Sequence, residues 1–458
     1  MKNPALVPEL RELLRRKKFG VLKSFISENH PKETAEFLSM LNPNEIWRIL
    51  ALVDIYTRVD IFEYFDIDVQ VELVSGSMRS HITELLEELS ADSRADLFQH
   101  LEKDMADRLL LRLPVKERAD IIKLTSYTEK SAGSIMTTDQ ATLNENYTVE
   151  QSIRKVRKDA PSKETVYYIY VIDDDGRLMG FVSLEKLILA KPRQRVKDIM
   201  KTEMIYANVA DDQERAAKLI EEYDLIALPI VDANHKLAGI VTYDDAIDII
   251  REEQTEDMER LMAISGEVAD KPYLEVPAFV HFKKRAFWVI VLALLGLATG
   301  LIVESFQNVL QTLLVLAFYM PMLNATGGNT GSQSATVVLR SLTLNELTFA
   351  DLGKVVRKEL EISAMLSLCL GAIVFARVVL FSSGDVPPDI SVANVALVIG
   401  ASLALQVIWS TTLGAAVPIV AKKVNVDPAL VSSPLLSTLV DMGGILIYFS
   451  MAKLILGI

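Results

Sequence analysis

The sequence predicts a multidomain chain: an α-solenoid-like N-terminal domain, tandem α/β domains, an acidic connecting helix and an α-helical membrane domain with five transmembrane helices. Three observations support this fold class. Short apolar helical patterns recur through residues 1–131, an internal strand–helix repeat fills residues 132–250, and long uncharged segments dominate residues 283–458. A chain of 458 residues has room for about two to four domains.

The N-terminal domain is predicted from helical patterns such as Thr34–Leu41, Arg94–Leu101 and Arg118–Leu124. Turn signals such as Asn42-Pro43 separate these patterns. Short helices of this kind bury one apolar face each only by stacking on their neighbours. The pattern therefore favours an α-solenoid-like domain.

Two acids lie near the start of one of these helices. Ser90 is its predicted N-cap, and Asp92 and Asp96 follow in the next turns. Acids there complement the helix dipole, so these residues taken alone predict a solvated face. The N-terminus of the chain lacks the apolar core of a signal peptide, and we expect this domain to be cytoplasmic.

The next part of the chain repeats itself. The two copies share a short Ile-Met segment and a hairpin: Ser134–Thr138 with Asp198–Thr202, and Ile169–Ser183 with Leu228–Thr242. Gly180 and Gly239 occupy matching hairpin positions. This repeat resembles a tandem of cystathionine-β-synthase-type (CBS) domains, with expected bounds of 132–195 and 196–250.

The CBS resemblance implies that an adenine nucleotide such as ATP binds, with a Thr/Ser-x-x-Asp motif holding the ribose. Thr242-Tyr-Asp-Asp245 fits this motif, whereas Ser183-Leu-Glu-Lys186 has Lys in place of Asp. At most one nucleotide site per pair is therefore expected, with Thr242 and Asp245 as its contacts. The alternative is that Thr242 caps the next helix and Asp245 supports its first turn.

A strongly acidic stretch follows. Residues 244–260 hold eight acids against Arg251 and Arg260, and four of the acids have i,i+4 spacing. Like charges at that spacing destabilise a helix by roughly 0.2–0.5 kcal/mol per pair. Carboxylate oxygens suit Mg²⁺ or Ca²⁺, so a divalent-cation surface is expected on a connecting helix and linker at 251–282. A solvated linker helix is the alternative.

Five long segments are apolar enough to predict membrane helices within the pore domain expected at 283–458. They are Ala286–Val303, 305–339, Ile362–Phe381, 390–421 and 428–452. Lys and Arg cluster before the first segment, between the second and third, and between the fourth and fifth. This bias predicts a cytoplasmic N-terminus and an outside C-terminus.

Two polar features interrupt the membrane segments. The run Asn324–Gln333 is polar and glycine-rich, which predicts either a hydrated, protein-enclosed surface or a close helix contact at Gly327 and Gly331. Asp441 is the sole charged residue between Asp427 and Lys453.

A carboxylate near the middle of a bilayer costs at least about 2.5–3.5 kcal/mol, so Asp441 should face protein, water or a cation. Ser437, Thr438 and Gly444 share its helical face. No basic residue lies within two helical turns of Asp441. The favoured interpretation is a cation pathway, and the alternative is a neutral, protonated Asp that joins helices.

Several classes of function are disfavoured. The net charge of −13 argues against a nucleic-acid partner. The single cysteine excludes a disulfide framework within the chain and a cysteine metal site, and the five histidines have no ligand spacing. No catalytic grouping is found, so no enzyme is expected.

The order of these parts, together with Ala325–Gly331, Asp427–Val431 and Asp441 with Gly444, resembles the MgtE family of bacterial magnesium channels and transporters. The resemblance implies a homodimer whose pore lies between protomers and is lined by the second and fifth membrane helices. It implies that Asp441 forms the central Mg²⁺ site, aided by the backbone at Ser437. Ser433, where some members carry Asn, departs from the pattern.

The resemblance also implies that cytosolic Mg²⁺ bridges acids of the connecting helix, the CBS pair and the N-domain, and so closes the pore. The matching positions are Asp92, Asp96, Glu214, Asp224, Asp245, Asp248, Glu253, Glu256 and Asp257. The expected function is Mg²⁺-selective, Mg²⁺-gated uptake across the bacterial inner membrane. The alternatives are a cation-coupled Mg²⁺ exchanger and a membrane-anchored nucleotide or cation sensor without transport.

Overall fold

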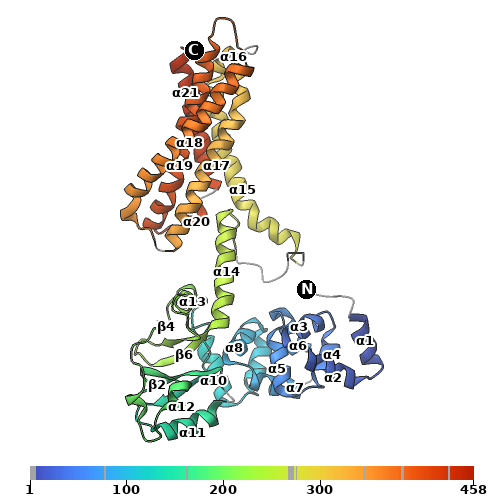
Figure 1. The fold of residues 1–458 in the computed structure, drawn as a ribbon. Coiled ribbons are helices and arrows are strands. Elements are labelled where there is room, and N and C mark those ends of the chain that lie inside the picture. Colours follow the sequence, from blue (N-terminus) through green and yellow to red (C-terminus); the bar gives the residue numbers. More distant parts are fainter. Residues whose placement is uncertain are drawn as a thin grey trace. The chain divides into compact units, whose positions relative to one another are not determined.

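A computed structural model describes residues 7–76, 79–160, 163–266, 273–274, 276–344, 346–382, 386–431 and 434–457. The chain forms two compact units, Met1–Arg251 and Glu252–Ile458. The first unit holds the N-domain and the α/β pair, and the second holds the long apolar helices (Figure 1).

The described part of the N-domain consists of ten short helices. They are α1 (Val7–Arg15), α2 (Phe19–Glu28), α3 (Pro31–Leu38), α4 (Pro43–Leu50), α5 (Ile55–Glu63), α6 (Ile67–Gly76), α7 (Arg79–Glu88), α8 (Ala91–His100), α9 (Lys103–Leu110) and α10 (Val115–Leu124). Alternate helices pack on one another: α3 on α5 and α5 on α7, and α4 on α6, α6 on α8 and α8 on α10. This pattern is the predicted stacking of short helices (Figure 1).

A predicted turn signal shows how the sequence starts these helices. Asn42 caps α4: its side chain accepts a hydrogen bond from the backbone of Glu45, whose carboxylate accepts one from the backbone of Asn42. Pro43 takes the first helical position, where its missing N–H is not needed. Behind the cap, Trp47 is buried and its indole donates to the carbonyl of Leu73 on α6.

The α/β pair contains two three-stranded sheets of the same topology, β1-β2-β3 and β4-β5-β6. Their elements are β1 (Gln140–Asn144), α11 (Val149–Asp159), β2 (Thr165–Ile172), β3 (Leu178–Ser183), α12 (Leu184–Leu189), η3 (Val196–Asp198), β4 (Ala207–Asn208), α13 (Gln213–Glu222), β5 (Ala227–Val231), β6 (Leu237–Thr242) and α14 (Tyr243–Leu261). In each sheet the first pair of strands is parallel and the second antiparallel. The predicted repeat is therefore confirmed as two equivalent hairpins.

The two hairpin glycines explain why the repeat carries an Ile-Met segment. Gly180 of β3 lies against the backbone of Lys201, and Gly239 of β6 lies against the backbone of Thr137. A Cβ at either glycine would collide with that backbone. Each Ile-Met segment thus packs on the hairpin of the other copy, which joins the two α/β domains.

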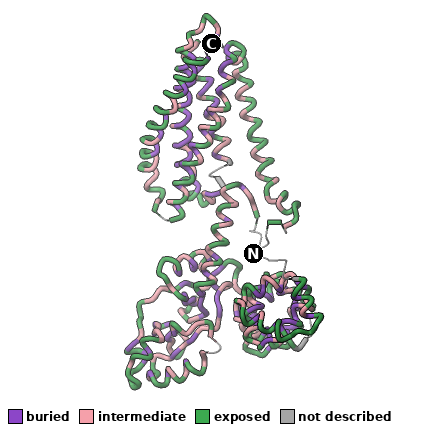
Figure 2. Tube along the Cα trace, turned by 45° about the vertical axis from the view of Figure 1, so that its right-hand side comes forward, coloured by how far each residue is buried: buried purple, intermediate pink, exposed green. Residues whose placement is uncertain are grey.

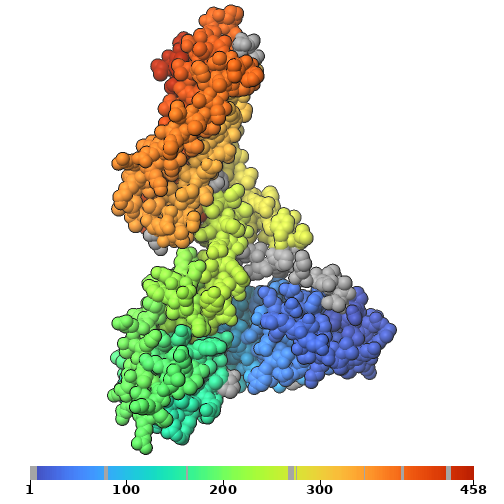
Figure 3. All heavy atoms as spheres, in the orientation of Figure 1, coloured from blue at the N-terminus to red at the C-terminus, as the bar shows by residue number. Residues whose placement is uncertain are grey.

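The N-domain and the α/β pair share one core. Ala91 and Ala95 of α8 and Leu124 of α10 are buried with residues of the second sheet. Lys123 of α10 donates to the carbonyl of Ala238 on β6. Figure 3 shows the surfaces of the N-domain (blue) and the α/β pair (green) in contact.

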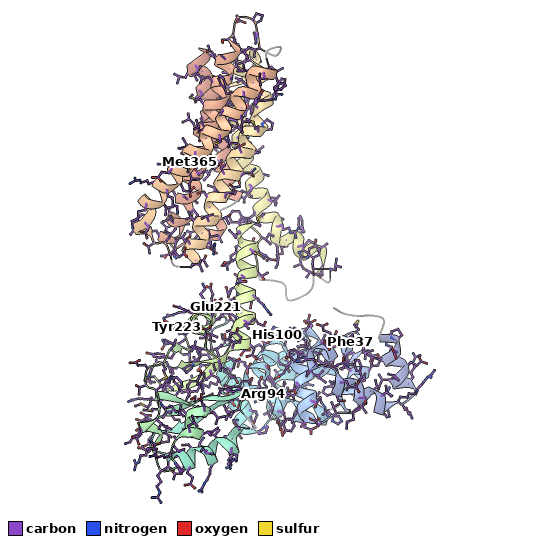
Figure 4. The ribbon with its side chains drawn as sticks, in the orientation of Figure 1. Phe37, Arg94, His100, Glu221, Tyr223 and Met365 are labelled. Atoms are coloured by element: carbon purple, nitrogen blue, oxygen red, sulfur yellow. The ribbon has the colours of Figure 1, made fainter. Side chains whose placement is uncertain are left out.

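The second unit is helical. Besides the end of α14, its helices are α15 (Ala278–Ser305), α16 (Gln307–Thr312), α17 (Val315–Thr343), η4 (Phe349–Asp351), α18 (Leu352–Phe381), α19 (Val392–Lys423), α20 (Pro428–Val431) and α21 (Pro434–Leu456). Helix α19 packs against α17, α18 and α21 and carries many of the buried residues, whereas α15 buries none (Figure 2). Met365 on α18 is among the exposed apolar side chains and points outward in Figure 4.

Four described helices are long and apolar enough to cross a membrane: Ala278–Ser305, Phe349–Phe381, Val392–Lys423 and Leu435–Leu456. The remaining predicted span, the second one at 305–339, corresponds to α17, which has 29 residues but contains the polar run Asn324–Gln333. Length alone would let α17 cross, since a helix rises about 1.5 Å per residue. The four apolar helices support a membrane protein, and the five-span count stays a prediction.

Candidate functional site

Asp441 lies in the middle of α21, among apolar neighbours. Val440 and Ile445 are buried in the helical bundle, and Asp441 itself is partly exposed. Among the residues that the structure describes, Asp441 has no ion pair. Ser437, one turn earlier, is also partly exposed, and Ser433 lies outside the described residues. The predicted pore carboxylate is therefore accessible from one side of a largely apolar helix.

Gly444 has a different environment from Asp441, although the sequence groups them on one face. Gly444 is buried against the side chain of Gln406 on α19, so it serves helix packing. Asp441, one turn away on α21, remains partly exposed to solvent.

The polar run of α17 divides into two faces. On the inner face, Thr330 and Ser410 of α19 share a 2.6 Å hydrogen bond, and Ser334 donates to the carbonyl of Thr411 over 3.0 Å. On the other face, Asn329 and Gln333 are exposed. The close helix contact predicted at Gly327 and Gly331 is therefore confirmed, because both glycines lie against α19, whereas a hydrated surface on the exposed face stays a prediction.

The end of α14 carries a buried acid with a basic partner. Glu256 is 8% exposed and pairs with Arg260 one turn later. Arg260 also pairs with Asp427, just before α20, at 3.1 Å. Further along, Glu259 pairs with Lys284 of α15 at 3.7 Å. Basic residues therefore neutralise part of the acidic stretch, which the charge count alone does not show.

A second acidic cluster lies where α8 meets the α/β pair. Burial, with the charge of Asp92 beside it, raises the pKa of Asp245 to about 7. Burial, with Asp92 and Glu63 nearby, raises the pKa of Glu164 to about 8. Burial also raises the pKa of Asp92, although hydrogen bonds from its own backbone and from Thr137 act the other way. Asp92 and Asp245 therefore lie close enough for their charges to interact.

Ser90 occupies the predicted N-cap position of α8, but its side chain does not cap the helix. Its hydroxyl donates instead to Glu63 of α5 over 3.0 Å. Both residues line a cavity of about 430 Å³ together with Asp139, Glu164 and the buried Arg94. Figure 4 labels Arg94, at the junction of the N-domain and the α/β pair. The prediction that Asp92 merely lies on a solvated face was wrong, because α8 packs on the second sheet.

The remaining predicted acids are more exposed. Asp96 lies on α8 beside His100, Asp248 pairs with Arg251 at 3.3 Å, and Glu214 pairs with Lys218 at 2.5 Å. Glu214 is the second residue of α13 and Asp224 follows the end of this helix, so about 15 Å along the helix axis separates them. Glu253 and Asp257 are partly exposed. Within the described residues, no group of three His, Cys, Asp or Glu side chains is arranged to hold a metal ion.

The predicted ribose motif faces the N-domain. Thr242 is buried at the end of β6 and its hydroxyl donates to Asp245 over 2.5 Å. A separate apolar cleft of about 70 Å³ is lined by Tyr168, Phe181 and Ile205, among others, and Tyr168 is paired in register with Ser183. The cleft therefore lies beside the copy of the motif that carries Lys186, and nucleotide contact at Thr242 and Asp245 stays a prediction.

Sequence reasoning missed two residues of the acidic cluster at α8. Glu63 lies on α5 and Glu164 just before β2, both distant in sequence from Asp92, and no motif marks them. Arg260 and Asp427 were noted in the sequence, but their ion pair was not predicted, because it depends on the packing of α14 near α20.

Comparisons with known proteins cover the whole chain. Family models match the MgtE intracellular N domain at residues 29–130, CBS domains at 132–193 and 196–252, and the MgtE divalent cation transporter domain at 320–451. The magnesium transporter MgtE of Thermus thermophilus is 36% identical over 454 residues, 98% of each chain. The magnesium transporter MgtE of Bacillus subtilis is 31% identical over 441 residues, 96% of this chain and 95% of its own.

Solved structures match the first unit. A crystal structure of the cytosolic domain of the Mg²⁺ channel MgtE in complex with ATP is 35% identical, with a TM-score of 0.50, and covers 53% of this chain and 100% of that one. The soluble part of a magnesium transporter is 29% identical, with a TM-score of 0.50, and covers 54% and 98%. The arrangement of N-domain, CBS pair and apolar helices, with these matches, shows that the chain belongs to the MgtE family of divalent cation transporters.

Proposed function

We propose that the chain is a Mg²⁺ channel or transporter that works as a homodimer in the bacterial inner membrane, with its N-terminus in the cytoplasm and its C-terminus outside. The observation that carries the proposal is Asp441: a carboxylate in the middle of an apolar helix, accessible from one side and without an ion pair among the described residues. Such a charge is unfavourable in a membrane unless an ion or water faces it.

The chemistry of Mg²⁺ agrees with a single carboxylate per protomer. Mg²⁺ gives up its water reluctantly and keeps several water ligands when it binds protein. A path for the hydrated ion therefore needs few carboxylates and enough width. Two Asp441 side chains across a dimer axis, with the backbone near Ser437, meet that need, and the ion supplies the charge that each carboxylate requires.

We further propose that cytosolic Mg²⁺ closes the path by binding between acids of the N-domain, the CBS pair and α14. Asp92 and Asp245 lie close enough for their charges to interact, and both have raised pKa values, so a divalent cation would relieve their repulsion. The proposed regulatory acids also include Asp96, Glu214, Asp224, Asp248, Glu253, Glu256 and Asp257. An adenine nucleotide such as ATP is a further proposed ligand of the CBS pair, on the strength of the relative solved with ATP.

Flux into proteoliposomes of the purified full-length protein tests the transport proposal. We expect Mg²⁺ entry driven by a Mg²⁺ gradient alone. Entry that requires a Na⁺ or H⁺ gradient would indicate coupled exchange, and no entry under any gradient would indicate a sensor.

Combined neutralisation of three acids tests the gating proposal. We expect the Asp245→Asn, Asp248→Asn, Glu256→Gln variant to stay open, with protease cleavage within residues 244–270, at Mg²⁺ concentrations that silence the wild type. Closure at the wild-type concentration would show that α14 is a linker without a regulatory role.

A further inference from the structure

A buried glutamine, Gln406 of α19, stands where three helices of the second unit meet. Its side chain is 0% exposed, and neither its amide nitrogen nor its amide oxygen has a hydrogen-bond partner among the described residues. A carboxamide offers two donors and one acceptor oxygen. Buried polar groups in native proteins are nearly always paired, so an unpaired amide in this place calls for a functional explanation.

Two glycines on different helices make room for this side chain. A Cβ at Gly327 of α17 or at Gly444 of α21 would collide with the carboxamide of Gln406. A Cβ at Gly328, the next residue, would meet nothing within 4 Å. Of the neighbours Gly327 and Gly328, only Gly327 therefore requires glycine, and the carboxamide of Gln406 fills the space between it and Gly444.

The helix that carries Gln406 is tied to α17 by hydrogen bonds. The Thr330–Ser410 and Ser334–Thr411 contacts lie one and two turns beyond Gly327. The α17–α19 pair thus forms a fixed base against which α21 packs. Asp441 lies three residues before Gly444 on α21, so a change in the Gln406–Gly444 contact displaces the carboxylate.

We propose that Gln406 is a positioning residue for the transport site: its carboxamide, wedged between Gly327 and Gly444, sets the place of α21 and therefore of Asp441. This inference rests on the proposed role of Asp441. An apolar side chain of similar volume would fill the same space without burying an amide. The amide is therefore assigned a second role, in a displacement of α21. If α21 shifts so that one of its main-chain carbonyl oxygens comes within reach of the Gln406 amide, the shifted position gains a hydrogen bond.

A double-variant experiment on the full-length protein in proteoliposomes tests the wedge. We expect Gly444→Ala to lower Mg²⁺ flux at least about tenfold and to raise the Mg²⁺ concentration for half-maximal flux, because the new Cβ displaces the carboxamide and α21. Adding Gln406→Ala removes the collision, so the double variant should regain the flux of Gln406→Ala alone within about threefold. If Gly444→Ala does not fold, recovery of folded protein in the double variant gives the same answer.

Gly443 provides the matched control. A Cβ at Gly443 would collide with the indole of Trp409 and not with Gln406. Gln406→Ala should therefore leave the defect of Gly443→Ala unchanged. The proposed contact would be wrong if Gln406→Ala failed to restore flux to Gly444→Ala, or if it restored flux equally to both glycine variants.

A second comparison tests the polar part of the proposal. Gln406→Met keeps the volume without the amide, and we expect a higher thermal midpoint together with at least about tenfold lower Mg²⁺ flux. Ser402 lies one turn earlier on α19, is also fully buried, and has an unpaired hydroxyl among the described residues, so Ser402→Ala should raise stability without lowering flux. Wild-type flux in Gln406→Met would overturn this part, whereas wild-type flux in Asp441→Asn would reject the proposed function instead.

Discussion

Two acidic sites of the second unit differ in how their charge is balanced. Asp441 on α21 has no ion pair among the described residues, whereas Glu256 on α14 has Arg260, which also holds Asp427. The comparison shows that carboxylates of one chain can differ in whether the fold itself supplies their counter-charge. On the proposed function, Asp441 takes its counter-charge from an ion in solution, whereas Arg260 already supplies it to Glu256.

The largest expected effect comes from removing the charge that has no internal partner in the described part of the chain. Asp441→Asn should lower Mg²⁺ flux by about a hundredfold or more, because the neutral amide no longer offsets the charge of the passing ion. The thermal midpoint should stay the same or rise, since a charge in an apolar helix is unfavourable for folding. Flux and melting of the purified protein measure both, and a variant that conducts normally would remove Asp441 from the ion path.

The next effect comes from removing the internal cation of the other site. Arg260→Gln leaves Glu256 and Asp427 facing each other, so Mg²⁺ should close the path at a concentration about fivefold lower. An ion pair this exposed is worth up to about 1 kcal/mol, which corresponds to that factor. Titration of flux against cytosolic-side Mg²⁺ measures the shift. Closure that needs more Mg²⁺ than in the wild type would mean that Arg260 holds the closed arrangement itself.

The acidic contact of the first unit should respond to pH. Asp245 has a pKa of about 7 in the folded protein against an ordinary 3.8, so the folded form binds more protons between these values. The contribution of Asp245 to the free energy of unfolding is therefore fully present below pH 3.8. It is lost, by at most about 4 kcal/mol, as the pH rises from this value through about 7.

Without divalent ions, the thermal midpoint of the first unit in the full-length protein should fall between pH 6 and pH 8. Asp245→Asn should flatten this slope, and Asp92 and Glu164, whose pKa values are also raised, account for what remains. Saturating Mg²⁺ should reduce the slope in the wild type. A slope that Asp245→Asn leaves untouched would place the titrating proton elsewhere.

The smallest effect is expected at the exposed pair of α14. The side chains of Asp248 and Arg251 are 80% and 73% exposed, so solvent screens their 3.3 Å contact. Arg251→Gln should change the free energy of unfolding by no more than about 0.5 kcal/mol and leave the Mg²⁺ response unchanged. Arg251→Gln is also the matched control for Arg260→Gln. If both variants shifted the closing Mg²⁺ concentration equally, the cause would be the net charge of α14 and not the Arg260 ion pairs.

Much of the fold followed from local patterns. Turn chemistry at Asn42-Pro43 predicted a helix start that the structure shows as a capping box. The internal repeat predicted two equivalent hairpins, with Gly180 and Gly239 at matching strand positions. Long uncharged runs predicted the apolar helices, although the polar α17 falls outside the four that hydropathy identifies. These predictions succeed because caps, alternation and hydropathy are properties of neighbouring residues.

The sequence by itself determined the kind of site: a carboxylate isolated in an apolar helix, and an acidic helix beside an α/β pair. Only the tertiary structure decided what each charge meets. It placed Asp92 near Asp245, Arg260 between Glu256 and Asp427, and Gly444 against Gln406 instead of beside Asp441 on an open face. The physical reason is that ion pairing and burial depend on residues far apart in the chain, and their separation is set by helix packing, which no local pattern records.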